Sequence, residues 1–254
     1  HYGYNDFAFD ISKYLTCDGT TENVISVKVV HQTPSSRWYS GSGIYRDVEL
    51  IVTDAVHVSR NGTYVTTPNL ATEKDGDVTV KVQTDVQNDS SAQAAAQIRT
   101  TVLDAEGKAV SKAVTTDVTL AANSTAEKEQ TLKVNKPALW STENPNLYYV
   151  QTEVLVDGKV KDTYKTTYGF RYINFDANTG FSLNGKNVKL KGVCMHHDQG
   201  ALGAASERDA VYRQVKKLKE MGCNAIRTSH NTPSSVLLEA GNELGMMVMD
   251  ETFD

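Results

Sequence analysis

The stretch that decides the fold is residues 223–233, CNAIRTSHNTP. Gly222 ends an amphipathic helical pattern just before it, and an apolar run of strand length then leads to Arg227 and His230. The threonine and proline that close the stretch are typical of the cap and the first position of another helix. This order of helix, short strand and helix predicts a strand of a parallel sheet.

Two more apolar runs of strand length, residues 188–195 and 246–249, flank this stretch along the chain, and each also ends on polar side chains. The titratable residues that follow the three runs are His196, His197, Asp198, Arg227, His230, Asp250 and Glu251. Because active sites form where parallel strands end, we expect these side chains to gather at one face of the sheet.

Amphipathic patterns connect the three runs. The first begins at Ser206 as a variant of the capping box, with Asp209 in place of the usual glutamate. The residues predicted to share its apolar face are Val211, Val215, Leu218 and Met221. The second pattern covers residues 233–244 and ends at Gly245. The resulting β-α-β-α-β order predicts the first part of a (β/α)₈ barrel or of an open parallel sheet, since three strands cannot bury such a sheet on both sides.

Two β regions precede this unit. Residues 55–171 contain about seven short alternating runs separated by turn signals, a pattern typical of an immunoglobulin-like β-sandwich. Residues 181–188 predict a hairpin around Asn184-Gly185, a pair that favours a type I′ turn. In residues 1–54, the runs 24–30 and 44–52 predict strands, too few to close a sandwich by themselves.

Composition excludes several classes of protein. The chain has 254 residues, a net charge of -5 and 39% hydrophobic residues, which argues against binding to nucleic acid or to an anionic membrane surface. It has no apolar run of about 18 residues that could span a bilayer. Cys17, Cys194 and Cys223 are too few and too scattered for a disulfide framework or a zinc site, so we expect free thiols and no metal or cofactor. The sequence begins at His1 without an initiator methionine, so we interpret it as part of a longer polypeptide whose compartment, cytoplasmic or secreted, it does not indicate.

Several motifs in order resemble glycoside hydrolase family 2, the group that contains β-galactosidases and β-glucuronidases. Residues 36–48 resemble the end of the family's N-terminal jelly roll, and residues 168–171 resemble the exit from its immunoglobulin-like domain. Residues 181–193 resemble the barrel entry, while residues 224–230 and 249–251 resemble later barrel strands. The resemblance implies part of a jelly roll (1–54), an immunoglobulin-like sandwich (55–171) and the first β-α-β-α-β of a TIM barrel (172–254).

The resemblance also implies a retaining exo-glycosidase that acts on terminal β-galactosides. Residues 194–205 are similar to bacterial β-galactosidases with a His-His-Asp loop, although Cys194 and Met195 depart from the better-known Asn-Arg. A β-glucuronidase or another β-glycosidase remains the alternative, as does a non-catalytic carbohydrate-binding or adhesion fragment. A fragment of some other β/α enzyme is a further possibility, in which His196 and His230 would not converge.

The family's two catalytic glutamates are expected on later strands, because the only Asn-Glu pair here, Asn242-Glu243, falls within a predicted helix. We therefore expect the chain alone to be inactive. The expected partners are a carbohydrate and either the rest of the barrel or a second copy of the chain. Mg²⁺ or Na⁺ is compatible with the complete enzyme.

The resemblance assigns His196 and His230 to sugar hydroxyls, since a neutral imidazole both donates and accepts a hydrogen bond. Arg227 is expected to orient a catalytic carboxylate from a later strand. The remaining candidates for the site are Asp198, Asp250, Glu251, His197, Arg37 and Trp38. For the last two residues, a loop packed between domains accounts for the pattern equally well.

Overall fold

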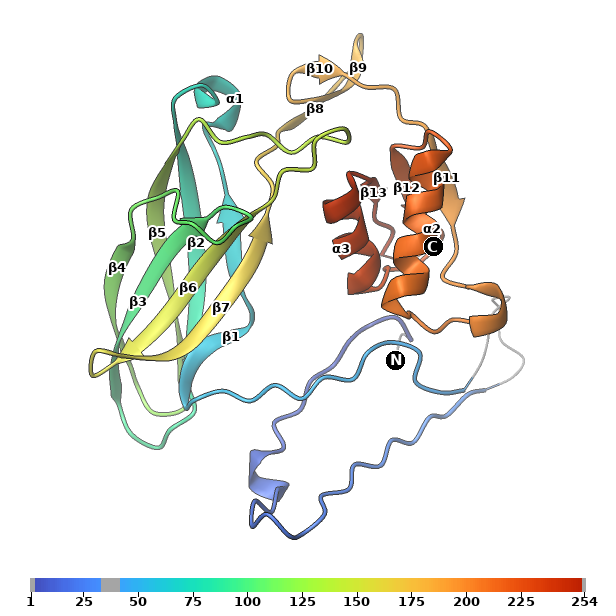
Figure 1. The fold of residues 1–254 in the computed structure, drawn as a ribbon. Helices are drawn as coiled ribbons and strands as arrows, with labels where there is room; N and C mark the ends of the chain where they lie inside the picture. Colours follow the sequence, from blue (N-terminus) through green and yellow to red (C-terminus); the bar gives the residue numbers. More distant parts are fainter. Residues whose placement is uncertain (1–2, 33–41, 253–254) are drawn as a thin grey trace.

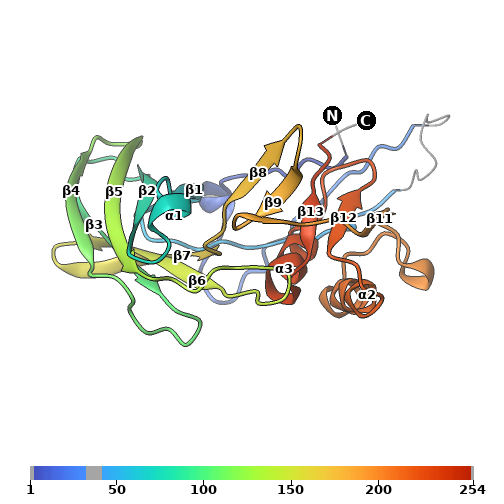
Figure 2. The ribbon, with the colours of Figure 1, turned by 90° about the horizontal axis from the view of Figure 1, so that it is seen from above.

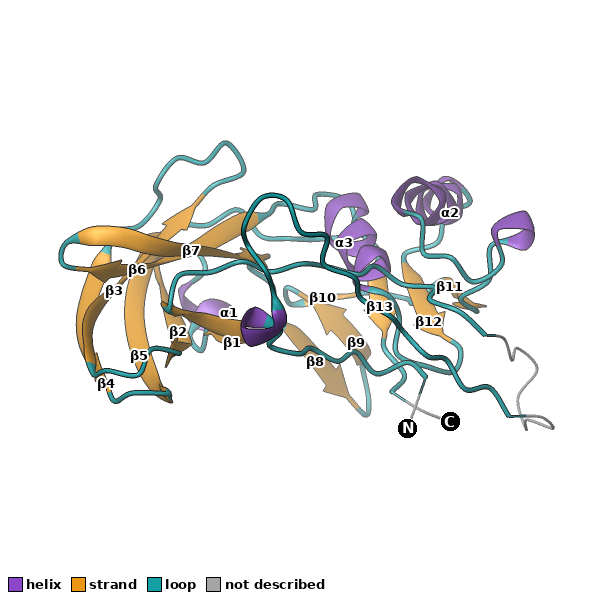
Figure 3. Cartoon of the chain, turned by 90° about the horizontal axis from the view of Figure 1, so that it is seen from below, coloured by secondary structure: helices purple, strands orange, loops and turns teal. Residues whose placement is uncertain are grey.

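The computed structural model describes residues 3–32 and 42–252. In this part of the chain, a β-sandwich and a β/α unit lie at opposite ends, with a small three-stranded sheet between them (Figure 1). The N-terminal segment, residues 3–32 and 42–54, passes the sandwich and reaches the β/α unit (Figures 1 and 3). The predicted order of an antiparallel sandwich followed by a parallel β/α unit is confirmed.

The sandwich consists of two antiparallel sheets. The first contains, in order, β1 (Val56–Thr66), β2 (Asp77–Asn88) and β5 (Ser124–Asn135). The second contains β4 (Val114–Leu120), β3 (Ala94–Leu103), β6 (Tyr148–Val156) and β7 (Lys159–Tyr168). A short helix, α1 (Leu70–Glu73), connects β1 to β2. Strict alternation of buried and exposed residues along β2 shows why this sequence forms strands with one face in a core.

The sandwich core is mainly apolar, but it also encloses polar side chains, those of Thr84, Asn88, Thr100, Gln130 and Thr152. Val80 and Val150 are completely buried, and the ring of Phe170 meets that of Tyr148 edge to face at 4.8 Å. The amide of Gln130 is buried among them and donates to the carbonyl oxygen of Ile98 at 3.0 Å. Its carbonyl oxygen accepts from the Thr100 hydroxyl at 2.6 Å, so burial leaves this side chain fully bonded.

The small sheet contains the predicted hairpin. It consists of β8 (Ile173–Asp176), β9 (Gly180–Leu183) and β10 (Lys186–Asn187), in the order β10-β9-β8. Asn184 has φ 54° and Gly185 has φ 76°, the two positive angles that a type I′ turn requires. The Asn184 side chain also donates to the carbonyl oxygen of Trp140 at 2.9 Å, which fastens the hairpin to the sandwich.

The β/α unit is a three-stranded parallel sheet with helices on one face. The elements along the chain are β11 (Gly192–Met195), η2 (Gly200–Leu202), α2 (Arg208–Glu220), β12 (Ala225–Thr228), α3 (Ser235–Leu244) and β13 (Met247–Met249). The strand order is β11-β12-β13, and α2 and α3 cover the same side of it (Figure 2). Ile226, Val215 and Ala240 are almost completely buried between these two layers. The predicted β-α-β-α-β order is therefore confirmed.

Both helices begin later than the sequence pattern predicts. Helix α2 begins at Arg208, and Glu207, not Ser206, is its N-cap without a side-chain capping bond. The backbone N–H of Ser206 instead donates to the carbonyl oxygen of Tyr45 at 3.0 Å, a contact with the N-terminal segment that local sequence does not reveal. Helix α3 begins at Ser235, with Ser234 rather than Thr232 at the N-cap position.

Met221, which the spacing placed on the buried face of α2, is the C-cap residue and is 74% exposed. It lies past the last helical turn, where the chain leaves the helix, so the helical period no longer sets its direction. Gly222 follows with φ 92°, as expected for a helix stop.

The strands predicted for residues 24–30 and 44–52 are not formed. Residues 3–32 and 42–54 contain only the short 3₁₀ helix η1 (Ser12–Tyr14) and otherwise no helix or strand. Val24 and Val52 are 77% and 83% exposed. An alternating apolar pattern forms a strand only where a neighbouring strand pairs with its backbone, and this segment has no such neighbour among the described residues.

A joint centred on Trp140 connects the sandwich to the β/α unit. Its indole N–H donates to the carbonyl oxygen of Asn242 in α3 at 2.9 Å, and the side chain is almost completely buried. The Arg171 guanidinium lies over the indole at 4.8 Å. Across the same joint, the Lys219 ammonium donates to the carbonyl oxygens of Thr142 and Gly245, the latter at 2.7 Å. Within residues 3–32 and 42–252, no helix has the length and apolar character that crossing a membrane requires.

Two glycine substitutions test this joint. Gly180 and Gly245 have φ angles of 81° and 71°, so alanine is strained at either position. At Gly180 a Cβ meets nothing within 4 Å, whereas at Gly245 it would overlap the Thr142 carbonyl group. We expect Gly180→Ala to lower the free energy of unfolding by about 1 kcal/mol and Gly245→Ala by about 3 kcal/mol. Equal losses in chemical denaturation would show that the joint does not restrict Gly245.

Candidate active site

The parallel register brings the polar ends of three strands together. Arg227 in β12 lies opposite Cys194 in β11 and Met249 in β13. The residues that follow these positions therefore leave the sheet at the same edge. A further link ties β12 to the segment after β13, because the backbone N–H of Glu251 donates to the Thr228 hydroxyl at 2.9 Å.

Glu251 is the centre of the charged group at this edge. One carboxylate oxygen, Oε2, lies 2.8 Å from Nδ1 of His230, and the other, Oε1, pairs with the Arg227 guanidinium. Because a carboxylate only accepts hydrogen bonds, Nδ1 of His230 must carry the proton. In the neutral ring, Nε2 of His230 is then an acceptor. Glu251 therefore fixes both the orientation and the tautomer of His230.

His196 adjoins this group from the end of β11. Its ring meets the His230 ring edge to face, with centroids 5.9 Å apart and planes at 89°. Both side chains are half-buried, so each keeps a face toward solvent. The two imidazoles thus come from adjacent strands and meet at one edge of the sheet.

Two opposing effects act on the ionisation of Glu251. Its partial burial would raise the pKa of the carboxyl group, but hydrogen bonds from His230 and Arg227 outweigh burial and lower the pKa below its usual value. Arg227 also donates to the Cys194 sulfur at 3.5 Å, which lowers the pKa of that thiol. The edge of the sheet therefore favours the ionised form of the Glu251 carboxyl group.

The other predicted residues lie apart from this group. Asp198 and Asp250 are exposed; the Asp198 carbonyl oxygen accepts from Gln214 at 3.4 Å, and Asp250 has no ion pair with any residue that the structure describes. His197 meets the Tyr4 hydroxyl, which lies 3.4 Å from Nε2. Its burial and the nearby charge of Arg46 lower the pKa of His197. Arg37 and Trp38 lie outside the described residues.

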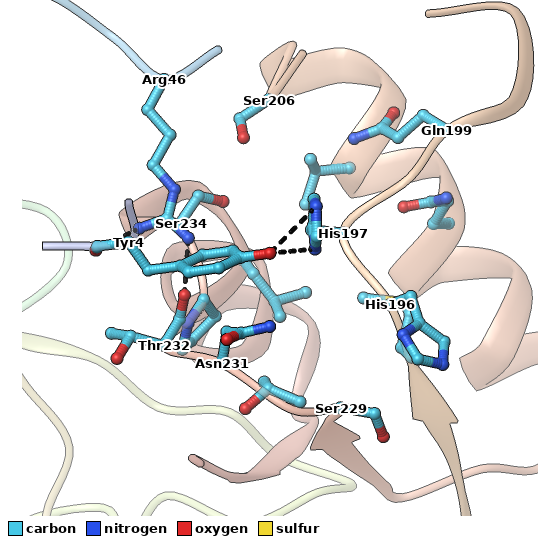
Figure 4. Close-up of a pocket in the computed structure, with 16 residues that line it drawn as sticks. Tyr4, Arg46, His196, His197, Gln199, Ser206, Ser229, Asn231, Thr232 and Ser234 are labelled. Carbon is cyan, nitrogen blue, oxygen red and sulfur yellow. Dashed lines mark hydrogen bonds between the residues drawn. The ribbon is translucent and has the colours of Figure 1, made fainter. Parts of the chain in front are cut away.

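A cavity of about 40 Å³ lies behind the two histidine-bearing loops (Figure 4). Its walls come from the loops after β11 and β12, from α2 and α3, and from the N-terminal segment through Tyr4 and Arg46. Tyr4 and Arg46 were not among the site residues predicted from the sequence. Their sequence context gave little indication of a role in the site. Tyr4 is an aromatic residue near the start of the chain, and Arg46 lies in a run that predicts a strand. Each is far in sequence from the site residues that it contacts.

No group of three or more His, Cys, Asp or Glu side chains suited to a metal ion occurs within residues 3–32 and 42–252. The groups that the site presents are imidazole, guanidinium and carboxylate groups, which can form hydrogen bonds with polar groups such as hydroxyls.

Comparison with known proteins gives a consistent picture. A family model described as "Glycosyl hydrolases family 2" matches residues 56–171, and "Glycosyl hydrolases family 2, TIM barrel domain" matches residues 177–253. The β-galactosidase BoGH2A of Bacteroides ovatus is 41% identical over the whole chain, which covers 29% of that protein. A putative β-glucuronidase of Formosa agariphila is 39% identical over the whole chain, which covers 23% of that protein.

Solved structures that are similar to this chain are also glycoside hydrolases of this family or β-glucuronidases. A glycosyl hydrolase family 2 member from Bacteroides cellulosilyticus matches 87% of this chain and 30% of its own with a TM-score of 0.81 and 40% identity. A Bacteroides uniformis β-glucuronidase matches 87% of this chain and 27% of its own with a TM-score of 0.78 and 31% identity.

A sandwich domain followed by a parallel β/α unit with a polar strand-end site is the domain order that the two family models describe. The chain belongs to glycoside hydrolase family 2. It spans less than a third of the length of the relatives just described.

The acid dependence of stability tests the role of Glu251. Because its pKa is lowered by folding, the stabilisation from its ionised form is complete above the usual value of 4.5 and is lost as the pH falls through the lower folded pKa. We expect the melting temperature of wild type to exceed that of Glu251→Gln at pH 6 to 7 and the difference to shrink toward about pH 3. Thermal melts across this range provide the measurement.

Asp250→Asn is the matched control. Asp250 precedes Glu251 in the sequence and its side chain is exposed, so this substitution also removes one negative charge but breaks no ion pair of Glu251. It should leave the melting temperature almost unchanged at pH 6 to 7. A difference between wild type and Glu251→Gln that stays constant from pH 7 to pH 3 would contradict the ion-pair interpretation.

Proposed function

We propose that this chain forms the entry side of the active site in a longer retaining exo-glycosidase that hydrolyses terminal β-galactosides. The observation that carries the proposal is the convergence of His196, His230, Arg227 and Glu251 at the ends of three adjacent parallel strands. The 41% identity to a protein named β-galactosidase, over the whole chain, supports the choice of sugar.

In this proposal, His196 and His230 bind sugar hydroxyls. The tautomer fixed by Glu251 makes Nε2 of His230 a hydrogen-bond acceptor, which suits a hydroxyl group as donor. A hydrogen bond that tightens as positive charge develops on the sugar ring stabilises the transition state more than the bound substrate.

Within the described residues, Arg227 pairs with Glu251 of this chain. Its expected role toward a carboxylate from a later strand stays a prediction. A general acid needs a raised pKa, whereas that of Glu251 is lowered, and both of its oxygens already have partners. Glu251 therefore positions His230, and the catalytic pair of carboxyl groups, about 5 Å apart in a retaining enzyme, comes from outside this chain.

A β-glucuronidase is the second candidate, because the relative at 39% identity has that name. A glucuronide adds a carboxylate, which needs a cationic partner. The guanidinium beside His230, that of Arg227, is paired with Glu251, so this edge of the sheet favours the neutral sugar. A binding module without catalysis is a weaker candidate, since a β/α unit with imidazoles at its strand ends has no function in such a module.

The partner that completes the site is either the rest of the barrel or a second copy of this chain. Strands β11 and β13 are the two edges of the described parallel sheet, and each presents one row of backbone groups without a strand neighbour among the described residues. Such edges pair readily with another strand. When expressed alone, the chain should therefore self-associate, and a stable monomer in sedimentation would contradict this.

Kinetics of the longer enzyme test the proposal. We expect His230→Ala to lower kcat/KM for an aryl β-galactoside about 100-fold, equivalent to about 2.7 kcal/mol, while thermal stability changes little. His57→Gln in β1 of the sandwich is the matched control and should keep wild-type kinetics. The chain alone should give no hydrolysis above background because it lacks the catalytic carboxyl pair.

Aryl β-glucuronide, assayed in parallel, separates the two candidates. Faster turnover of the glucuronide by wild type would exclude the β-galactosidase assignment in favour of the second candidate. An unaffected His230→Ala variant would remove His230 from the site.

A further inference from the structure

We propose that Arg46, on the N-terminal segment, is a positioning residue that holds the loop carrying His230 in its active arrangement. The inference rests on the function proposed above. It extends the site to a residue that lies far from the barrel strands in sequence and that does not touch the sugar-binding imidazole itself.

The Arg46 guanidinium connects two distant parts of the chain. One terminal nitrogen donates to the carbonyl oxygen of Thr232 at 2.5 Å, two residues beyond His230. The other donates to the carbonyl oxygen of Tyr4 at 3.2 Å. Nε is buried and has no hydrogen-bond partner among the described residues, so the two terminal nitrogens make all the hydrogen bonds described for this side chain.

Two tyrosine rings fix the plane of the guanidinium. Its central carbon lies 5.6 Å from the centroid of Tyr4 and 5.2 Å from that of Tyr45. The Tyr45 hydroxyl donates to the carbonyl oxygen of Gly3 at 3.0 Å, which connects the two parts of the N-terminal segment. Because the guanidinium lies against two aromatic rings and is bonded at two ends, the planar fork has little rotational freedom left, and a lysine could not reproduce this geometry.

The same cluster also fixes the loop after β11. The Tyr4 hydroxyl meets His197 at 3.4 Å, and the backbone N–H of Ser206 donates to the Tyr45 carbonyl oxygen at 3.0 Å. Figure 4 shows the Tyr4 side chain extending from the side of Arg46 toward His197, with Thr232 below them. One cluster therefore attaches both histidine-bearing loops to the N-terminal segment.

The position of Thr232 makes this attachment relevant to His230. The backbone of the loop is fixed before His230 by the bond from the Ser229 N–H to the Met195 carbonyl oxygen, at 3.1 Å. It is fixed after His230 by Arg46. Since displacements of about 1 Å can reduce rates about 100-fold, losing one of these two restraints should lower turnover measurably.

The test uses the complete enzyme with Arg46→Ala, Arg46→Lys and the control Arg208→Ala. Arg208 is also stacked on a tyrosine, 4.1 Å from the Tyr212 ring, and pairs with Glu243, but on the outer face of α2 and α3. We expect both Arg46 variants to lower kcat about tenfold with little change in KM, because substrate binding groups remain present. Guanidinium ion at low concentration should restore part of the activity of Arg46→Ala and none of that of Arg46→Lys, whose side chain still fills the site.

Hydrogen exchange measured by mass spectrometry gives a readout that does not depend on the substrate. Amides in residues 229–237 should exchange about tenfold faster in Arg46→Ala than in wild type or Arg208→Ala. The inference would be overturned if hydrogen exchange in Arg46→Ala were the same as in wild type. It would also be overturned if kcat of both Arg46 variants equalled that of wild type. If Arg46→Ala does not fold, the same hydrogen-exchange comparison is made with Arg46→Lys, and unchanged exchange in that variant would overturn the inference. A wild-type enzyme that hydrolyses neither aryl glycoside would refute the proposed function alone, while exchange would still decide the role of Arg46.

Discussion

The two oxygens of the Glu251 carboxylate hold the site together. Each accepts from a different cation or potential cation, Arg227 within β12 and His230 just after it, while the residue itself follows β13. Removing any member would leave a half-buried polar group unpaired, which costs more than the net gain of one hydrogen bond. The orientation of His230, the ionisation of Glu251 and the alignment of two strand ends therefore depend on one another. This coupling explains how short strands of three or four residues can present side chains in a defined arrangement.

Much of the fold could be predicted from local patterns. Alternation identifies the sandwich strands because one face of each is buried, and Asn184-Gly185 identifies a turn because few other pairs adopt two positive φ angles. The strand ends were predictable for a similar reason: in a β-α-β order, a short apolar run followed by His196 or His230 indicates a buried strand that has just ended. The pairing of Arg227 with Glu251, in contrast, depends on the register between β12 and β13, which local sequence does not specify.

What local patterns could not predict depends on contacts between distant segments. Residues 24–30 have the composition of a strand, but strand formation needs a partner strand, which this sequence does not reveal. Ser206 has the composition of a helix cap, but its N–H is bonded to the N-terminal segment. Arg46 belongs to the same class: its partners are 42 and 186 residues away along the chain.

The joint between the sandwich and the β/α unit has a consequence for sequence divergence. Its hydrogen-bond donors are the side chains of Trp140 and Lys219, while all the acceptors are backbone carbonyl oxygens. A carbonyl group is present whatever the side chain, so an acceptor position such as Asn242 is free to change over evolutionary time without loosening the connection. The donors have no such freedom. The surface sequences of the two domains can thus change during evolution, and each domain can come to contact other proteins or domains, while the angle between the two domains is retained.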